Sequence, residues 1–186
     1  MSLSPFTKEQ LLPQEEKLEI SKQKSELFIG IPKETSHQER RICLTPDAVN
    51  SLTYQGHRVM LESGAGESSS YSDKEYSDAG AKVVYSAKEA FESEVVLKVE
   101  PPSVEEINQM LPGSCLISAL QVGKQSAEYI HALNAKKITA VSFENLEDKV
   151  GGMPVVRAMS EIAGSTVMLI ASEYLSSVNE GKGLIL

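Results

Sequence analysis

Arg41 stands where its guanidinium could bind a small anion. The apolar run 28–31 before it is closed by a proline and predicts a buried strand, and the polar loop 33–39 follows. After Arg41, the segment 45–47 reads T-P-D and is typical of a helix start, with a cap, a proline and an acidic residue at the positive end of the dipole. We therefore expect the guanidinium to lie at the end of a strand, where open α/β sheets bind ligands. Its planar fork matches a carboxylate or a phosphate.

Lys98 is a second cation in unusual surroundings, because it interrupts the apolar run V-V-L-K-V at 95–99. An unpaired ammonium in a buried strand is costly, so this side chain needs a partner or a ligand. The sequence is equally compatible with two interpretations. Either Lys98 and Arg41 converge on one anion, or Lys98 forms an internal salt bridge, for example with Glu34 or Glu39.

Three further segments have both a functional and a purely structural interpretation. His37 lies in the loop before Arg41 and is a candidate acid/base group, since histidine titrates near neutrality. The turn G-A-G at 64–66 stands where a dinucleotide-binding turn would stand, but it lacks the third glycine, so glycines shaping a tight turn are the favoured interpretation. Ser160, followed by Glu161, is expected to begin the longest helical pattern, either as a plain cap or as part of a phosphate site.

The elements that must position these residues alternate along the chain. Short β-branched runs alternate with capped helical stretches, which is typical of a parallel sheet with crossover helices. The expected strands are 27–31, 57–62, 81–85, 94–99, 114–120 and 138–142. The expected helices are 46–55, 73–79, 87–91, 104–111, 126–134 and 160–175. The predicted fold class is a three-layer α/β domain with a mostly parallel sheet and helices on both faces.

Composition excludes several kinds of partner. The net charge of −8 argues against nucleic acid and anionic membranes, although a local pair of cations could still bind an anionic metabolite. We expect no membrane partner, because no run approaches the roughly 18 apolar residues of a membrane span. The first residues lack the apolar core of a secretion signal, and the 2 cysteines show no metal or disulfide spacing, as in a cytoplasmic protein. The histidines show no metal spacing either, so we expect no metal site.

The chain is expected to fall into three parts. Residues 1–26 form a polar N-terminal extension, in which 14–24 could form a helix. Residues 27–158 form the substrate domain, and 159–186 form a linking helix and the entry to a further domain. The chain ends on the apolar run 184–186, which reads as the start of a strand. We therefore expect an N-terminal fragment of a two-domain protein.

Four motifs carry a resemblance to a known family. They are I-G-I-P-K-E-T with R-I-C-L-T-P, then G-H-R-V-M-L-E-S-G-A-G-E, then V-L-K-V-E-P-P, and finally A-M-S-E-I-A-G. Residues 28–186 thereby resemble the N-terminal domain shared by alanine dehydrogenases and the alpha subunits of nicotinamide nucleotide transhydrogenases, with alanine dehydrogenase the better match. The resemblance implies a Rossmann-like substrate domain, a further domain that binds NAD, a small-molecule substrate and a homo-oligomer.

The same resemblance implies roles for individual residues. Arg41 would grip the substrate carboxylate, and Lys98 would contact that carboxylate and the oxygen or nitrogen on the reacting carbon. Glu144 matches a glutamate that orients the arginine. Met159, Ser160 and Glu161 match a segment beside the cofactor. The implied activity is the NAD-dependent interconversion of L-alanine with pyruvate and ammonia.

Gln121 departs from the family pattern, because alanine dehydrogenases usually carry an acid/base histidine there. Glutamine hydrogen-bonds a carbonyl but does not transfer a proton near neutrality. Proton transfer would then fall to an aspartate of the further domain, to Lys98 or to water.

Three alternatives to alanine dehydrogenase stay open. A transhydrogenase is the first, although Gly151 and Pro154 stand where its functional glutamine and aspartate would align. A saccharopine-type dehydrogenase is the second. The third is a non-catalytic domain that binds a small acid.

Overall fold

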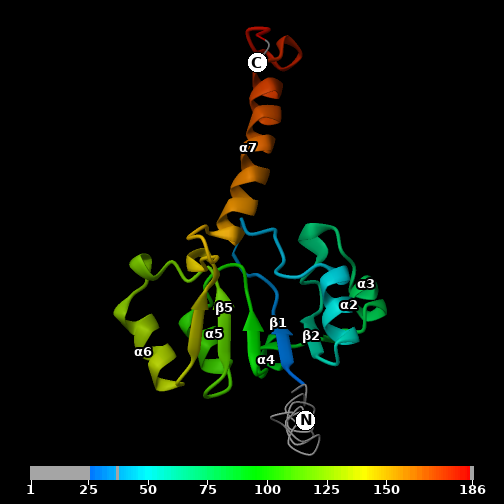
Figure 1. The fold of residues 1–186 in the computed structure, drawn as a ribbon. Helices are drawn as coiled ribbons and strands as arrows, with labels where there is room; N and C mark the ends of the chain where they lie inside the picture. Colours follow the sequence, from blue (N-terminus) through cyan, green and yellow to red (C-terminus); the bar gives the residue numbers. More distant parts are fainter. Residues whose placement is uncertain (1–25, 37, 185–186) are drawn as a thin grey trace, which may run out of the picture.

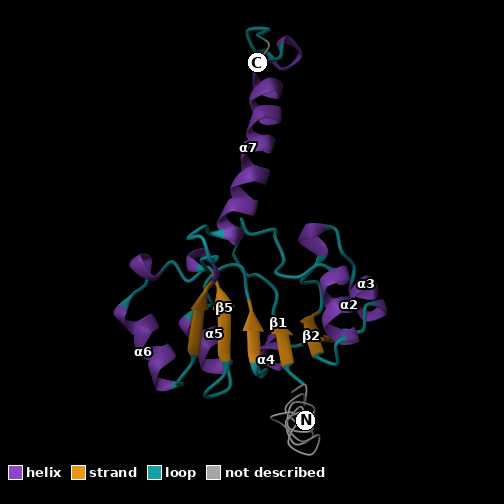
Figure 2. Ribbon diagram, viewed as in Figure 1, coloured by secondary structure: helices purple, strands orange, loops and turns teal. Residues whose placement is uncertain are grey.

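The computed structural model describes residues 26–36 and 38–184 and contains one parallel sheet, shown in Figures 1 and 2. Its strands are β1 (Phe28–Ile31), β2 (Arg58–Glu62), β3 (Lys82–Val84), β4 (Val95–Leu97), β5 (Cys115–Ser118) and β6 (Thr139–Ser142). The helices are α2 (Pro46–Tyr54), α3 (Asp73–Asp78), α4 (Ala87–Phe91), α5 (Val104–Gln109), α6 (Ala127–Ala135) and α7 (Pro154–Leu175). Single 3₁₀ turns are η1 (Glu67–Ser69), η2 (Val122–Lys124), η3 (Phe143–Asn145) and η4 (Ser177–Asn179).

All six predicted strands are confirmed, each slightly shorter than expected. The predicted fold class, a parallel sheet between two helical layers, is also confirmed. Five of the six helices lie where they were predicted, and Ser72 and Ser103 form full capping boxes at the starts of α3 and α5. The predicted extension helix within 14–24 lies outside the described residues.

The two faces of the sheet carry separate apolar clusters. Alternate strand residues point to opposite faces, so Ile29 of β1 faces one cluster and Val96 of β4 faces the other. The first cluster packs against α2 and α3, and the second packs against α4, α5 and α6. This division between two faces explains why the strands read as continuous apolar runs.

The strand order is β3-β2-β1-β4-β5-β6, so the chain winds outward from β1 in one direction and from β4 in the other. β1 and β4 are direct neighbours, with Ile29 paired to Val95. In a doubly wound sheet, the point where the winding reverses leaves a crevice at the carboxyl ends of the two strands, and ligands bind there. The loops that leave β1 and β4 carry Arg41 and Lys98, respectively.

The predicted start of the long helix at Ser160 is wrong, because α7 begins at Pro154. A proline at the first helical position needs no hydrogen-bond partner for its nitrogen, so the helix starts there without a side-chain cap. The helix projects from the edge where the strands end, away from the sheet (Figure 1). Among the described residues, α7 alone has the length and composition of a possible membrane span, and none of it is buried. The expectation that no segment approaches such a span is therefore not confirmed.

Candidate functional site

The loop after β1, which carries Arg41, forms no helix or strand in its described residues, and hydrogen bonds fix it to other parts of the domain. The hydroxyl of Ser69 donates to the carbonyl oxygen of Arg40 at 2.6 Å. The phenol of Tyr76, from the buried face of α3, donates to the carbonyl oxygen of Leu44 at 2.8 Å. The backbone on both sides of Arg41 is therefore tied to the domain, which limits the positions open to its side chain.

Arg41 forms a bidentate ion pair with Glu39, two residues before it in the same loop. The Nε of Arg41 donates to Oε1 of Glu39 at 2.8 Å, and Nη2 donates to Oε2 at 2.5 Å. These hydrogen bonds are the main reason that the pKa of Glu39 lies below its usual value and that the pKa of Arg41 is raised. The Glu39 side chain is 5% exposed and that of Arg41 is 52% exposed, so the pair presents the guanidinium to solvent and buries the carboxylate.

Lys98 is almost fully buried, with 1% of its side chain exposed, and its ammonium lies between two glutamates. Its Nζ donates to Oε2 of Glu34 at 3.0 Å and lies 3.7 Å from Oε1 of Glu106. The second oxygen of Glu34 accepts the backbone N–H of Val99 at 2.6 Å. The internal salt bridge that the sequence left open is therefore present, and Glu34 is its main partner.

Arg41 and Lys98 line two different hollows. Arg41 borders a largely apolar hollow of about 290 Å³, together with residues that include Leu97, Ile117 and Met159. Lys98 borders a hollow of about 420 Å³ with a mixed polar and apolar lining, between the starts of α5 and α6. Three carboxylates, those of Glu34, Glu39 and Glu106, surround the two cations. An anion that binds to Arg41 or Lys98 therefore needs N–H groups that these carboxylates leave free. In this structure each cation is paired with its own carboxylate, Arg41 with Glu39 and Lys98 with Glu34.

Gln121 and Glu144 are brought together at the ends of β5 and β6. The backbone N–H of Gln121 donates to Oε1 of Glu144 at 2.8 Å, and the backbone of Gln121 is left-handed, with φ of 44°. Desolvation is the largest single influence on the pKa of Glu144 and acts to raise it, but hydrogen bonds from Ser142 and from backbone N–H groups together lower it. Glu144 is thus held as a carboxylate against Gln121, and no hydrogen bond joins it to Arg41 among the described residues.

The predicted cofactor residues Met159, Ser160 and Glu161 lie inside α7 and not at its start. Ser160 comes six residues after Pro154, so it is not the cap of a free helix terminus and its predicted phosphate site is not formed. Glu161 accepts a hydrogen bond from Nε of Arg157 at 3.0 Å, one helical turn away. Met159 borders the hollow that Arg41 lines, so this side chain remains at the candidate site.

In the glycine turn at 64–66, the backbone N–H groups of Gly64 and Ala65 are bound within the protein, to Asp73 and to the carbonyl oxygen of Glu62. The carboxylate of Asp73 accepts the backbone N–H of Gly64 at 2.8 Å and the hydroxyl of Ser63 at 2.7 Å. A Cβ on Gly66 would lie 2.6 Å from the ring of Tyr76, so the second glycine serves close packing. The tight-turn interpretation is confirmed. His37, the predicted acid/base candidate, lies outside the described residues.

Sequence reasoning missed two neighbours of the cationic residues. Glu39 was considered as a partner of Lys98, but it binds Arg41, and the spacing E-R-R offered this pairing as a local alternative. Cys43 borders the same hollow as Arg41, and burial raises the pKa of its thiol to about 12. A neutral thiol on the wall of the hollow adds to its apolar character.

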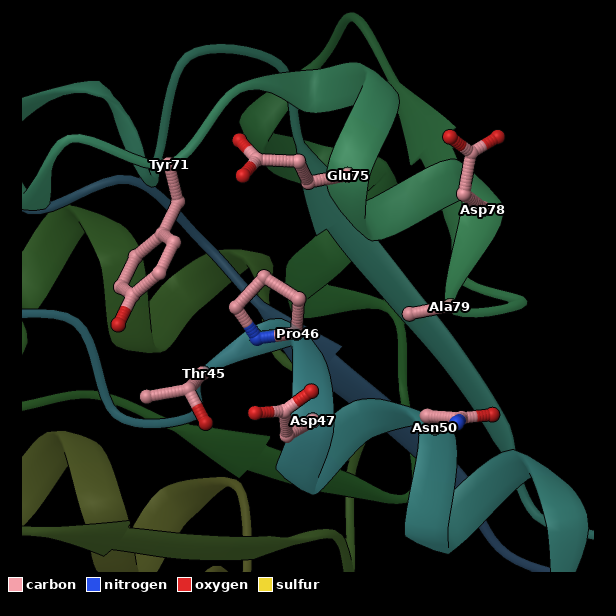
Figure 3. A pocket seen from close by; sticks show the side chains of 8 residues that line it. All are labelled: Thr45, Pro46, Asp47, Asn50, Tyr71, Glu75, Asp78 and Ala79. Atoms are coloured by element: carbon pink, nitrogen blue, oxygen red, sulfur yellow. The ribbon is translucent and has the colours of Figure 1, made fainter.

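A separate acidic hollow of about 470 Å³ lies between the first part of α2 and the length of α3 (Figure 3). Its lining includes Asp47, Glu75 and Asp78, whose carboxylates lie apart and do not meet at one point (Figure 3). In the part of the chain that the structure describes, no group of three His, Cys, Asp or Glu side chains could hold a metal ion.

These features define a doubly wound α/β domain with two paired cations beside the point where its winding reverses. A family model described as "Alanine dehydrogenase/PNT, N-terminal domain" matches residues 30–163. The chain therefore belongs to this family, as its motifs predicted.

Individual proteins and solved structures agree with the family match. The alanine dehydrogenase of Lysinibacillus sphaericus is 38% identical over 159 residues, which are 85% of this chain and 42% of that protein. A solved L-alanine dehydrogenase superimposes with a TM-score of 0.79 at 34% identity, covering 86% of this chain and 44% of the other. The transhydrogenase from Sinorhizobium meliloti gives a TM-score of 0.60 at 32% identity, covering 66% of this chain and 36% of the other. The chain thus spans less than half the length of these relatives.

Proposed function

We propose that this chain is the substrate-binding part of an NAD-dependent alanine dehydrogenase, which interconverts L-alanine with pyruvate and ammonia. The observation that carries the proposal is the position of Arg41, whose half-exposed guanidinium borders an apolar hollow beside the carboxyl ends of β4 and β5. Such a hollow suits a small acid whose carboxylate meets the guanidinium and whose methyl group meets apolar walls. The similarity to alanine dehydrogenases supports the same reaction.

The proposed roles of the individual residues come from the resemblance to the family. Arg41 binds the substrate carboxylate. Lys98, whose ammonium is held between Glu34 and Glu106, contacts the same carboxylate and the oxygen or nitrogen on the reacting carbon. Gln121 donates a hydrogen bond to that group, and its backbone is fixed by Glu144. Since glutamine does not transfer protons, the proton of the reaction passes through Lys98, water or an acid of a further domain.

NAD supplies the hydride acceptor of this reaction when it is bound. On this chain, Met159 would contact the nicotinamide, because this residue borders the hollow that Arg41 lines. Ser160 and Glu161, further along the exposed helix α7, contribute polar contacts to the rest of the cofactor. We assign most of the nucleotide binding to a further domain of the parent protein, and we expect that protein to be a cytoplasmic homo-oligomer.

An activity assay of the parent protein that contains this chain tests the proposal. We expect oxidation of NADH that requires both pyruvate and ammonium. In the reverse direction, we expect reduction of NAD that requires L-alanine. Absence of both reactions refutes the proposal.

A transhydrogenase is the second candidate, supported by the similarity to the Sinorhizobium meliloti protein. The same assay separates the two. A transhydrogenase would transfer hydride from one nicotinamide nucleotide to another without pyruvate, whereas the alanine dehydrogenase proposed here would not. A domain that only binds a small acid would retain pyruvate without turning it over.

A further inference from the structure

Glu39 binds one edge of the Arg41 guanidinium and leaves the opposite edge open. A guanidinium has five N–H donors in a fixed plane, and the Nε and Nη2 atoms form its side-on edge. Both of these atoms donate to Glu39, at 2.8 Å and 2.5 Å. Across residues 26–36 and 38–184, Nη1 donates no hydrogen bond to the protein. The end-on edge formed by Nη1 and Nη2 is therefore available to a second carboxylate.

The Glu39 carboxylate is itself fixed relative to the loop. Its Oε1 accepts the backbone N–H of Arg41 at 2.8 Å as well as the side-chain hydrogen bond. The backbone N–H of Glu39 donates to the carbonyl oxygen of Ser36 at 3.2 Å, which closes a tight turn. With only 5% of its side chain exposed, Glu39 is a rigid base on which the guanidinium plane rests. A long flexible arginine gains a single orientation from this contact.

We propose that Glu39 is a positioning residue for substrate binding. It holds the Arg41 guanidinium side-on and leaves the end-on edge for the carboxylate of a small 2-oxo or 2-amino acid that enters the hollow of about 290 Å³ that Arg41 lines. The proposal rests on the proposed function, because it assigns Arg41 to the substrate carboxylate. It adds that the ion pair is not broken when substrate binds, and that pre-organisation of the guanidinium lowers the KM.

Two other roles for Glu39 would give different kinetic results. If Glu39 were an internal competitor that occupies Arg41 until substrate displaces it, removing its carboxylate would lower the KM for pyruvate. If Glu39 only stabilised the loop, its removal would act equally whether or not Arg41 is present. A double-mutant cycle between Glu39 and Arg41 separates these possibilities from the positioning role.

The experiment uses the full-length parent enzyme, with kcat and the KM for pyruvate measured in NADH oxidation at saturating ammonium. The variants are Glu39→Ala and Glu39→Gln, each made in the wild type and in an Arg41→Ala background. Glu92→Ala is the matched control, since Glu92 belongs to an exposed pair with Lys88 on α4. Thermal unfolding of each variant identifies loss of fold. Glu39→Gln, which preserves size, replaces Glu39→Ala in the comparison if the alanine variant does not fold.

We expect Glu39→Ala to raise the KM for pyruvate about tenfold with kcat within about twofold, and Glu39→Gln to raise it about threefold. In the Arg41→Ala background, either change should alter the KM by less than about twofold. A lowered KM, an unchanged KM, or an equal rise in both backgrounds overturns the positioning role while leaving the proposed function intact. Absence of turnover in the wild type overturns both.

Discussion

Removing one partner of the buried pair between Glu34 and Lys98 should strongly destabilise the domain. In the wild type, the backbone nitrogen of Val99 lies 2.6 Å from Oε1 of Glu34. Glu34→Gln removes the negative charge but keeps an oxygen that can accept this hydrogen bond. The ammonium of Lys98, with 1% of its side chain exposed, would then face only Glu106 at 3.7 Å. Breaking a buried pair on one side typically costs 3–5 kcal/mol, and because Glu106 remains we expect about 3 kcal/mol.

This loss is large against the total stability of about 5–15 kcal/mol for a domain. Urea denaturation followed by circular dichroism measures it, with the slope of the transition checked for two-state behaviour. The matched control is Glu92→Gln, which breaks an exposed pair with Lys88 at 3.5 Å. That change should cost less than about 0.5 kcal/mol, because solvent screens exposed pairs.

A second substitution tests the electrostatic reasoning itself. Replacing both members of a buried pair by uncharged groups is often neutral, so adding Lys98→Met to Glu34→Gln should restore part of the lost stability. Two results would refute the argument. One is a Glu34→Gln variant as stable as the Glu92→Gln control, and the other is a double variant less stable than Glu34→Gln alone.

Two other substitutions test the packing and the burial of single groups. Gly30→Ala would place a Cβ 1.8 Å from the carbonyl oxygen of Ala90, so we expect at least about 3 kcal/mol of destabilisation in urea denaturation. Gly123→Ala, whose Cβ would meet nothing within 4 Å, should change stability by less than about 0.5 kcal/mol, and equal effects would contradict this packing. The thiol of Cys43 has its pKa raised from 9.0 to about 12 by burial, so its contribution to stability is complete below pH 9 and is lost as the pH rises towards 12. Cys43→Ala should therefore lose stability less steeply than the wild type between pH 9 and 11, and parallel curves would count against a buried neutral thiol.

The strands and most helices could be predicted because their signals are local. Short β-branched runs identified the six strands, and capping residues identified five helix starts. The start of α7 was predicted too late, at Ser160, although Pro154 offers an equally local signal for a first helical position. The strand order could not be read from the sequence, because it depends on which runs pair in space. That order is what puts the loops after β1 and β4 beside one crevice.

At the candidate site, the sequence offered the contact between Lys98 and Glu34 as one of two alternatives and did not predict the contact between Arg41 and Glu39. A cation in an apolar run is a signal that burial requires a partner, and this reasoning identified Lys98 and proposed Glu34 among its partners. The pairing of Arg41 with Glu39 follows from the irregular backbone of a loop, which no periodicity describes. For the same reason, the sequence did not reveal that Arg41 and Lys98 border separate hollows.

The most direct test of the central claim, that Arg41 holds the substrate carboxylate, is the KM for pyruvate of the full-length Arg41→Ala enzyme. Loss of a charge-assisted, bidentate contact should raise this KM at least about tenfold, while the KM for NADH stays within about twofold. Arg40→Ala is the matched control, because the adjacent exposed arginine contributes its backbone carbonyl to the contact with Ser69 and this carbonyl remains. We predict a raised KM for pyruvate in Arg41→Ala alone, and equal KM values in the two variants would contradict the account.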